Sequence, residues 1–243
     1  MGPVTHVIFD LDGLLLNTEE TYNRVYQEVC LKLGRCYDPS LATKIRGRPE
    51  ADTFKIIVAD LQLPVEEDEF ARHLEIELTA LLPNCQLMPG AKRLLDHLQF
   101  HGIPMAIATS SRKDSFKLKT GHIDSQTGFY HYFNHMLTGG SDPRVKRGKP
   151  APDIFIECRK MFPPNTDGSL DPPNKFLVFE DAVAGVVGAV AAGMKVVMIP
   201  DENVDVEHER KDPAFRPTIV LRSLLDFKPE LFGLPPFPQE KRQ

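Results

Sequence analysis

A short apolar run near the N-terminus ends in two aspartates and a glycine, and this segment constrains the fold strongly. Residues 6–13 read His-Val-Ile-Phe-Asp-Leu-Asp-Gly, which predicts a buried strand of a parallel sheet at residues 7–9. Charges at the end of a buried strand need a partner or a cation, and ligands of open α/β sheets bind beyond the carboxyl ends of the strands. We therefore expect Asp10 and Asp12 in a ligand site, with Gly13 permitting the tight turn that orients them. The alternative is a solvated turn, in which aspartate and glycine are also common.

The second part of the chain alternates between predicted helices and predicted strands. Apolar stretches of strand length occur at residues 103–108, 135–137, 176–179, 195–199 and 218–221. Helices are predicted at residues 91–101, from residue 116 onward, at 152–161 and at 182–192. Such alternation is typical of the right-handed crossovers that build a parallel sheet. We predict an α/β fold whose core is a doubly wound, Rossmann-like parallel sheet.

A different pattern separates the first strand from this alternation. Residues 18–85 have helical periodicity and no convincing strand, with apolar residues from Tyr22 to Leu33 recurring at three- and four-residue steps. Further helices are predicted at residues 51–61 and 66–82. We therefore expect an all-helical cap domain, residues 18–86, inserted after the first strand of a core domain. That core would consist of residues 1–17 and 87–243.

Other polar residues follow predicted strands or stand in nearby loops. They are Thr109, Ser110, Lys149, Glu180 and Asp181. Because the carboxyl ends of parallel strands share one edge of a sheet, we expect these side chains to converge with the first two aspartates. Taken singly, Thr109 or the acidic pair can cap the helix that follows, and Lys149 can be an ordinary surface lysine. The combination favours a functional site over these separate structural roles.

Phosphoryl transfer is the chemistry that this set of residues fits best. A phosphate monoester is an anion whose transition state spreads charge over oxygens, so catalysis depends on positioning and electrostatics. We expect Asp10 to be the nucleophile, and Asp12 to act first as general acid and then as general base. Thr109, Ser110 and Lys149 are expected to bind the substrate phosphate.

A cation is needed because a carboxylate nucleophile repels an anionic substrate. Mg²⁺ prefers oxygen ligands and keeps some of its waters. Asp10 and Asp181 can supply carboxylate oxygens, and Glu180 can be a further ligand or support the others. We therefore predict Mg²⁺ as the cofactor.

Composition and charge narrow the class of protein further. The chain has 243 residues, a net charge of −5 and an isoelectric point near 5.9, which lacks the basic footprint of a nucleic-acid or anionic-membrane binder. No CxxC pair or zinc spacing occurs among Cys30, Cys36, Cys85 and Cys158, which we interpret as reduced thiols. Neither a signal peptide nor a bilayer-spanning run is predicted. We expect a cytoplasmic monomer that acts on a small-molecule phosphate monoester, without nucleic-acid or membrane partners.

The site residues lie in motifs that resemble those of the haloacid dehalogenase superfamily. These motifs are Phe9-Asp10-Leu11-Asp12-Gly13, Ala108-Thr109-Ser110-Ser111, Gly148-Lys149-Pro150 and Phe179-Glu180-Asp181-Ala182. The resemblance implies that Asp10 forms an aspartyl-phosphate, and that Asp12 is the acid/base and also binds the metal through its backbone carbonyl. It places Thr109 and Lys149 on phosphate-binding positions and the acidic pair on magnesium positions. It also implies that the helical insertion is a cap that closes over the site.

Several longer stretches resemble the pseudouridine-5'-phosphatases and their eukaryotic relatives within this superfamily. They are residues 101–104, 148–150, 177–182, 191–194, 196–201 and 227–235. The resemblance implies hydrolysis of a small phosphate monoester, with pseudouridine 5'-phosphate as the expected substrate. Glycerol phosphate and deoxy-sugar phosphates are the alternatives, because phosphatases for these compounds have very similar cores.

Other activities fit the residues less well. Phosphomutases of the β-phosphoglucomutase type carry a cap histidine where this chain has Tyr22. They also place an arginine three residues after a cap glycine, whereas Gly47 is followed here by Arg48, Pro49 and then Glu50. A carbon–halogen hydrolase does not need the second aspartate. A non-catalytic phosphate-binding module is expected to lack at least one site residue, and none is missing here.

Overall fold

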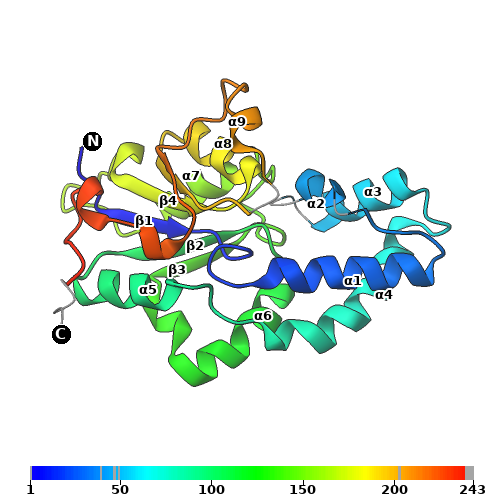
Figure 1. Ribbon diagram of the computed structural model, residues 1–243. Coiled ribbons are helices and arrows are strands. Elements are labelled where there is room, and N and C mark those ends of the chain that lie inside the picture. The colour runs from blue at the N-terminus through cyan, green and yellow to red at the C-terminus, as the bar shows by residue number, and fades with distance from the viewer. Residues whose placement is uncertain (1, 39, 46–47, 49, 202–203, 239–243) are drawn as a thin grey trace, which may run out of the picture.

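Parallel strands form the central sheet of the computed structural model, which describes all residues except 1, 39, 46–47, 49, 202–203 and 239–243 (Figure 1). The strands are β1 (His6–Phe9), β2 (Met105–Thr109), β3 (His135–Thr138), β4 (Phe176–Glu180), β5 (Lys195–Met198) and β6 (Ile219–Val220). Their order across the sheet is β3-β2-β1-β4-β5-β6, and all pairs are parallel. β1, β2 and β4 are buried along their whole length, as expected when both faces of a sheet are covered.

Helices cover both faces of this sheet. α5 (Ala91–Phe100) and α6 (Lys113–Thr127) pack on one face, and α7 (Asp153–Lys160) and α8 (Val183–Ala191) pack on the other (Figure 1). Successive strand residues point to opposite faces, so Phe9 packs with residues of α5 and α6, whereas Ile8 packs with residues of α7 and α8. The predicted doubly wound, Rossmann-like core is confirmed.

The chain reverses its direction across the sheet next to β1. It runs outward from β1 through β2 to β3 and then returns to β4, on the other side of β1. Ligands of doubly wound sheets bind outside the carboxyl ends of the strands at such a reversal. The residues that directly follow β1 and end β4 lie at this position, and they include Asp10 and Glu180.

The predicted helical insertion after β1 is present. It contains α1 (Thr18–Lys32), α2 (Ser40–Ile45), α3 (Glu50–Leu61), α4 (Glu67–Leu81) and the 3-10 turn η1 (Leu82–Asn84). These helices have an apolar cluster of their own, in which Val25, Phe70 and Leu74 are fully buried. They extend beyond one end of the sheet (Figure 1). The division into residues 18–86 and the remainder stays a prediction.

Short elements account for the differences from the predicted secondary structure. α2 and α9 (Val206–Glu209) were not predicted, because helices of 6 and 4 residues are too short to produce a clear periodicity. β6 has only 2 residues, both half-buried, and forms an edge of the sheet. The remaining 3-10 turns are η2 (Phe129–Tyr132), η3 (Pro173–Lys175), η4 (Leu224–Asp226) and η5 (Pro229–Phe232).

Two further observations concern the cysteines and the length of the helices. All four cysteines are free thiols; Cys30, Cys85 and Cys158 are buried and Cys36 is exposed. Within the part of the chain that the structure describes, no helix combines the length and apolar composition needed to cross a membrane.

Candidate active site

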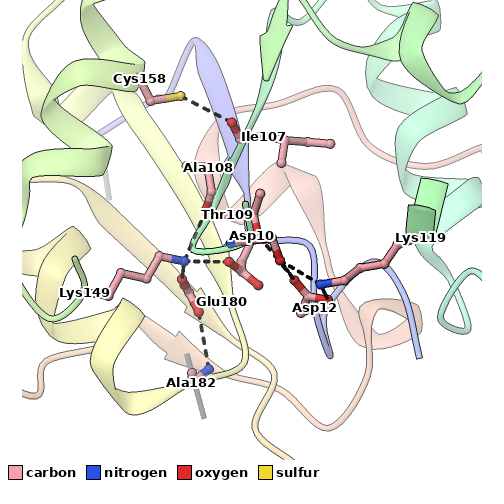
Figure 2. A network of polar contacts seen from close by, with 11 residues as sticks. Asp10, Asp12, Ile107, Ala108, Thr109, Lys119, Lys149, Cys158, Glu180 and Ala182 are labelled. Carbon is pink, nitrogen blue, oxygen red and sulfur yellow. Dashed lines mark hydrogen bonds and ion pairs between the residues drawn. The ribbon is translucent and has the colours of Figure 1, made fainter. Parts of the chain in front are cut away.

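Three adjacent strand ends bring predicted site residues together. β1 pairs with β2 on one side and with β4 on the other. Asp10 directly follows β1, while Thr109 and Glu180 are the last residues of β2 and β4. All three side chains are buried, and Figure 2 shows them near one another at the carboxyl edge of the sheet. The parallel sheet thus joins residues from distant parts of the chain.

Lys149 connects two of these carboxylates. Its Nζ donates to Asp10 Oδ1 and to Glu180 Oε1, each at 2.5 Å, and to the carbonyl of Ala108 at 3.2 Å (Figure 2). Burial lowers the pKa of Lys149, but the charges of Asp10 and Glu180 outweigh burial and raise that pKa. The structure therefore holds a fixed positive charge beside the predicted nucleophile.

Asp10 is an unusually weak acid in this environment. Burial raises its pKa to about 7; Lys149 acts in the opposite direction, and the charges of Glu180 and Asp12 add to the increase. One ammonium is thus not sufficient to balance the carboxylates around it. A divalent cation beside Asp10 would favour the ionised form, which is the form that a nucleophile requires.

Asp10, Glu180 and Asp181 form the candidate metal site. Each offers a carboxylate oxygen, and these oxygens lie within 4.8 Å of one another. Gly13 (φ +81°) approaches Asp181 so closely that a Cβ at this position would lie 2.4 Å from Oδ2. A cluster of buried carboxylate oxygens fits Mg²⁺, which prefers oxygen ligands. The metal roles, including that of the Asp12 backbone carbonyl, stay predictions.

Asp12 is held by three donors from β2, the residues after it, and α6. Thr109 Oγ1 and Ser111 Oγ donate to Oδ2 at 3.3 and 2.8 Å, and Lys119 Nζ donates to Oδ1 at 2.7 Å. Burial raises the pKa of Asp12, but the charge of Lys119 and the hydrogen bonds outweigh burial and lower that pKa. The side chain keeps 19% of its exposure and lines a cavity together with Ser110. Asp12 is therefore ionised in the free protein and accessible to a small molecule.

Sequence reasoning missed two of these donors, Ser111 and Lys119. Ser111 directly follows the predicted strand-end pair and could have been included on that ground. Lys119 lies on the same face of α6 as the buried Phe116 and Ile123. A lysine within the apolar stripe of a helix was the available signal, because a buried ammonium needs an anionic partner.

The cavity has a volume of about 70 Å³ and lies between the sheet edge and the helical insertion. Its insertion side includes Tyr22, Asn23 and Tyr26 of α1 and the exposed Arg48. The rings of Tyr22 and Tyr26 have their centroids 5.9 Å apart. A molecule bound at the strand ends would therefore touch both parts of the protein.

The sequence profile of one enzyme family, described as haloacid dehalogenase-like hydrolase, matches residues 7–199. The chain belongs to the haloacid dehalogenase-like hydrolases. The matched range begins in β1 and ends directly after β5, so it contains every predicted site residue. The family resemblance inferred from the motifs is confirmed.

Proteins from a plant and an insect resemble this haloacid dehalogenase-like hydrolase over nearly its whole length. A protein named (DL)-glycerol-3-phosphatase 2, from Arabidopsis thaliana, is 41% identical over 97% of this chain and 94% of its own. A probable pseudouridine-5'-phosphatase from Drosophila melanogaster is 40% identical over 96% of each chain. The two relatives are thus equally similar to this hydrolase while differing in the substrates they are named for.

Solved structures agree with the fold of this hydrolase. The crystal structure of CbbY from Rhodobacter sphaeroides, in complex with phosphate, superposes with a TM-score of 0.72. The superposition covers 92% of this chain and 96% of CbbY, at 20% sequence identity. The likeness at this identity concerns the arrangement of the elements alone.

Proposed function

We propose that this haloacid dehalogenase-like hydrolase cleaves a small phosphate monoester through an aspartyl-phosphate on Asp10, with Mg²⁺ as cofactor. The chain is a phosphoric monoester hydrolase, consistent with the phosphatase names of its relatives. The observation that carries the two-step proposal is the environment of Asp10. Asp10 lines the cavity, contacts Lys149 and belongs to the buried acidic cluster.

The first step transfers the phosphoryl group to the enzyme. A carboxylate oxygen of Asp10 attacks phosphorus while the bond from phosphorus to the leaving oxygen breaks. Asp12 first takes up the proton that a monoanionic ester carries on its phosphate, and then gives this proton to the leaving oxygen. Thr109, Ser110 and Lys149 hold the phosphate oxygens during the transfer. Asp10, Glu180 and Asp181 would hold Mg²⁺, which would supply the positive charge that lets an anionic nucleophile approach an anionic ester.

The second step regenerates the enzyme. Water attacks phosphorus, the bond from phosphorus to Asp10 breaks, and Asp12 accepts the proton of the attacking water. Inorganic phosphate leaves, Asp12 releases the accepted proton to the phosphate or to solvent, and both aspartates return to carboxylates. The lowered pKa of Asp12 suits this step in particular, because a general base must be ionised before the reaction.

Pseudouridine 5'-phosphate is the substrate that we propose first. The insect relative named for this activity supports it at 40% identity over 96% of the chain. In the structure, Tyr22 and Tyr26 offer aromatic surfaces beside the cavity. The Asn23 side chain also lines the cavity; its Oδ1 accepts from the Tyr37 hydroxyl, and its amide NH₂ is a donor group. Such groups suit a planar base with polar edges.

Glycerol 3-phosphate is the second candidate, and the size of the cavity favours it. A volume of about 70 Å³ has room for only a few water molecules or a group of similar size. A three-carbon polyol needs less additional space there than a nucleoside does. The plant relative named as a glycerol-3-phosphatase is 41% identical.

We propose that the phosphoryl group is transferred to water, as in a phosphatase, and not back to the substrate, as in a phosphomutase. Tyr22 lines the cavity where the phosphomutases resembling this chain carry a histidine, and a tyrosine hydroxyl is a poor proton carrier near neutral pH. Arg48 also lines the cavity, but Gly47 and Pro49, which belong to the same comparison, lie outside the described residues. The monomeric state and the cytoplasmic location stay predictions.

Steady-state kinetics on a panel of esters test this proposal. We would measure kcat/KM with Mg²⁺ for pseudouridine 5'-phosphate, uridine 5'-phosphate, glycerol 3-phosphate and 2-deoxyribose 5-phosphate. The proposed substrate is expected to exceed the others by about tenfold or more, a difference of roughly 1.4 kcal/mol in transition-state stabilisation. Preference for glycerol 3-phosphate would select the second candidate. Absence of phosphate release from every ester would contradict the phosphatase mechanism.

A further inference from the structure

Lys119 is a buried lysine that the proposed mechanism does not use. Its side chain is only 1% exposed, although it belongs to a helix whose neighbouring residues include the exposed Lys117. Its Nζ donates to Asp12 Oδ1 and to Ser111 Oγ, each at 2.7 Å. Burying an ammonium is costly unless it is paired and hydrogen-bonded, and these contacts supply both conditions. Its place in the fold therefore depends on Asp12.

Lys119 and Lys149 contact different aspartates. Lys149 contacts Asp10 and Glu180, whereas Lys119 reaches Asp12 from the other side, as Figure 2 shows. The two lysines therefore do not duplicate one another. Lys149 neutralises the nucleophile and its neighbour, and Lys119 acts on the residue proposed to transfer the proton.

The contacts around Asp12 restrict the orientation of its carboxylate. Lys119 holds Oδ1, while Ser111 and Thr109 hold Oδ2, so rotation of the carboxylate would break at least one hydrogen bond. An ionised carboxylate has about four acceptor sites, and three donors leave capacity for a proton that moves to or from a substrate. Asp12 also lines the cavity, where such a substrate would bind.

The helical insertion covers this arrangement. The ring of Tyr22, on α1, lies with its centroid 4.8 Å from Lys119 Nζ, a distance at which an ammonium is attracted to an aromatic ring. Tyr22 also lines the cavity. The insertion thus contacts both the space for the substrate and the lysine behind Asp12.

We infer that Lys119 is a positioning residue that holds the Asp12 carboxylate in the orientation needed for proton transfer. This inference rests on the proposed function, since it assigns the support of the acid/base residue named there. Lys119 also lines the cavity, but its ammonium donates to Asp12 and Ser111, so the role that we infer is exerted through Asp12. Its removal should therefore affect the part of catalysis that depends on Asp12 and leave the attack by Asp10 in place.

Kinetics of Lys119→Met, with Lys117→Met as the matched control, test the inference. The same substitution two residues away is at an exposed position of the same helix. We expect Lys119→Met to lower the single-turnover rate for an alkyl phosphate by about 10²-fold, within the range that general acid–base help supplies, and for an aryl phosphate much less. KM should change little, and Lys119→Arg should recover most of the rate because it keeps a charged donor. Equal losses for both esters, or a Lys119→Met protein like the control, would overturn the inference.

A double-mutant cycle separates positioning from general support of the fold. If Lys119 acts through Asp12, Lys119→Met should add almost nothing to the loss already caused by Asp12→Asn. If Lys119 only supports the fold, the rate losses of Lys119→Met and Asp12→Asn should multiply in the double variant. If Lys119→Met does not fold, Lys119→Gln, which keeps a neutral donor, takes its place in the same cycle.

Crystal structures of the variants provide a readout that does not require turnover. In Lys119→Met, we expect the Asp12 side chain to leave its wild-type rotamer or to occupy more than one rotamer. In Lys117→Met, we expect Asp12 to keep the wild-type rotamer. An unchanged Asp12 rotamer in Lys119→Met overturns the inference even if the wild-type protein hydrolyses none of the esters. If Asp12 is displaced in Lys119→Met but the wild-type protein hydrolyses none of the esters, the positioning role is supported and only the proposed function is contradicted.

Discussion

The carboxylate of Glu180 occupies the space in which a side chain at Gly185 would begin. A Cβ at position 185 would lie 1.9 Å from Glu180 Oε1, far closer than two such atoms can approach. Gly185 is in the first turn of α8, the helix that follows β4 and its acidic end. The carboxylate that accepts from Lys149 therefore depends on the absence of a side chain in a neighbouring helix.

Gly185→Ala is predicted to impair both stability and catalysis. The new methyl group must push Glu180 away from Lys149, and overpacking of this kind costs about 1–3 kcal/mol. We expect a lower free energy of unfolding in denaturant titrations and a lower kcat. Gly121→Ala is the control, because a Cβ at this exposed position of α6 would meet no atom within 4 Å. Alanine there should stabilise the helix by roughly 0.5–1 kcal/mol, and equal behaviour of the two variants would contradict the prediction.

Asp10→Asn is predicted to fold normally and to lose nearly all turnover. An amide cannot serve as the attacking carboxylate, and removal of a nucleophile commonly lowers kcat by about 10⁴-fold or more. Intact-mass measurements after acid quench should find a phosphorylated species in the wild type and none in the variant. Asp52→Asn, at an exposed position of α3, is the control and should keep full activity. Substantial turnover by Asp10→Asn would rule out its role as nucleophile.

Removal of divalent metal is predicted to abolish phosphate release. Chelation would leave the clustered oxygens of Asp10, Glu180 and Asp181 without the charge that screens the substrate. Mg²⁺ should restore activity, and Ca²⁺ should restore it poorly, because Ca²⁺ accepts looser and higher coordination. The measurement is phosphate release in chelator followed by titration of each ion. Full activity in excess chelator would contradict the metal site.

The affinity for Mg²⁺ is predicted to increase with pH. The pKa of Asp10 is raised to about 7 in the metal-free protein, so below that pH its carboxyl group mostly retains a proton that the metal must displace. The association constant should therefore increase by up to about tenfold per pH unit below pH 7 and level off above it. Isothermal titration calorimetry at several pH values measures this slope. Asp10→Asn should bind Mg²⁺ more weakly, and its association constant should depend less on pH. An equally steep pH dependence in the variant would mean that the proton displaced by Mg²⁺ belongs to another group.

Asp12→Asn is predicted to affect esters according to their leaving groups. Alkyl oxygens need a proton to leave, whereas aryl oxygens leave without much protonation, so the loss should be larger for alkyl phosphates. General acid help is typically worth about 10²–10⁴-fold. Single-turnover rates isolate the first transfer, and the variant should also accumulate phosphoenzyme because the second step lacks its base. Equal losses for the two classes of ester would mean that Asp12 mainly maintains the local geometry.

The sequence was sufficient to predict which site residues stand at strand ends and at which edge of the sheet they meet. Asp10 and Glu180 follow apolar runs of strand length, and the alternation of helices and strands requires a parallel sheet. All parallel strands end at the same edge, so the sequence alone predicts that Asp10 and Glu180 lie close together although they are far apart along the chain. This part of the site depends on local patterns and on one rule of topology.

Only the tertiary structure decided which side chains complete the site. Lys119 and Asp12 are 107 residues apart and come from a helix and a turn whose relative rotation no local pattern specifies. The need for glycine at position 185 is likewise visible only once α8 is packed beside the end of β4. Local sequence determines which residues are buried and where strands end, because backbone periodicity and hydrophobicity act over short distances. The contacts between helix side chains and strand ends depend instead on how the elements pack, which is a property of the whole chain.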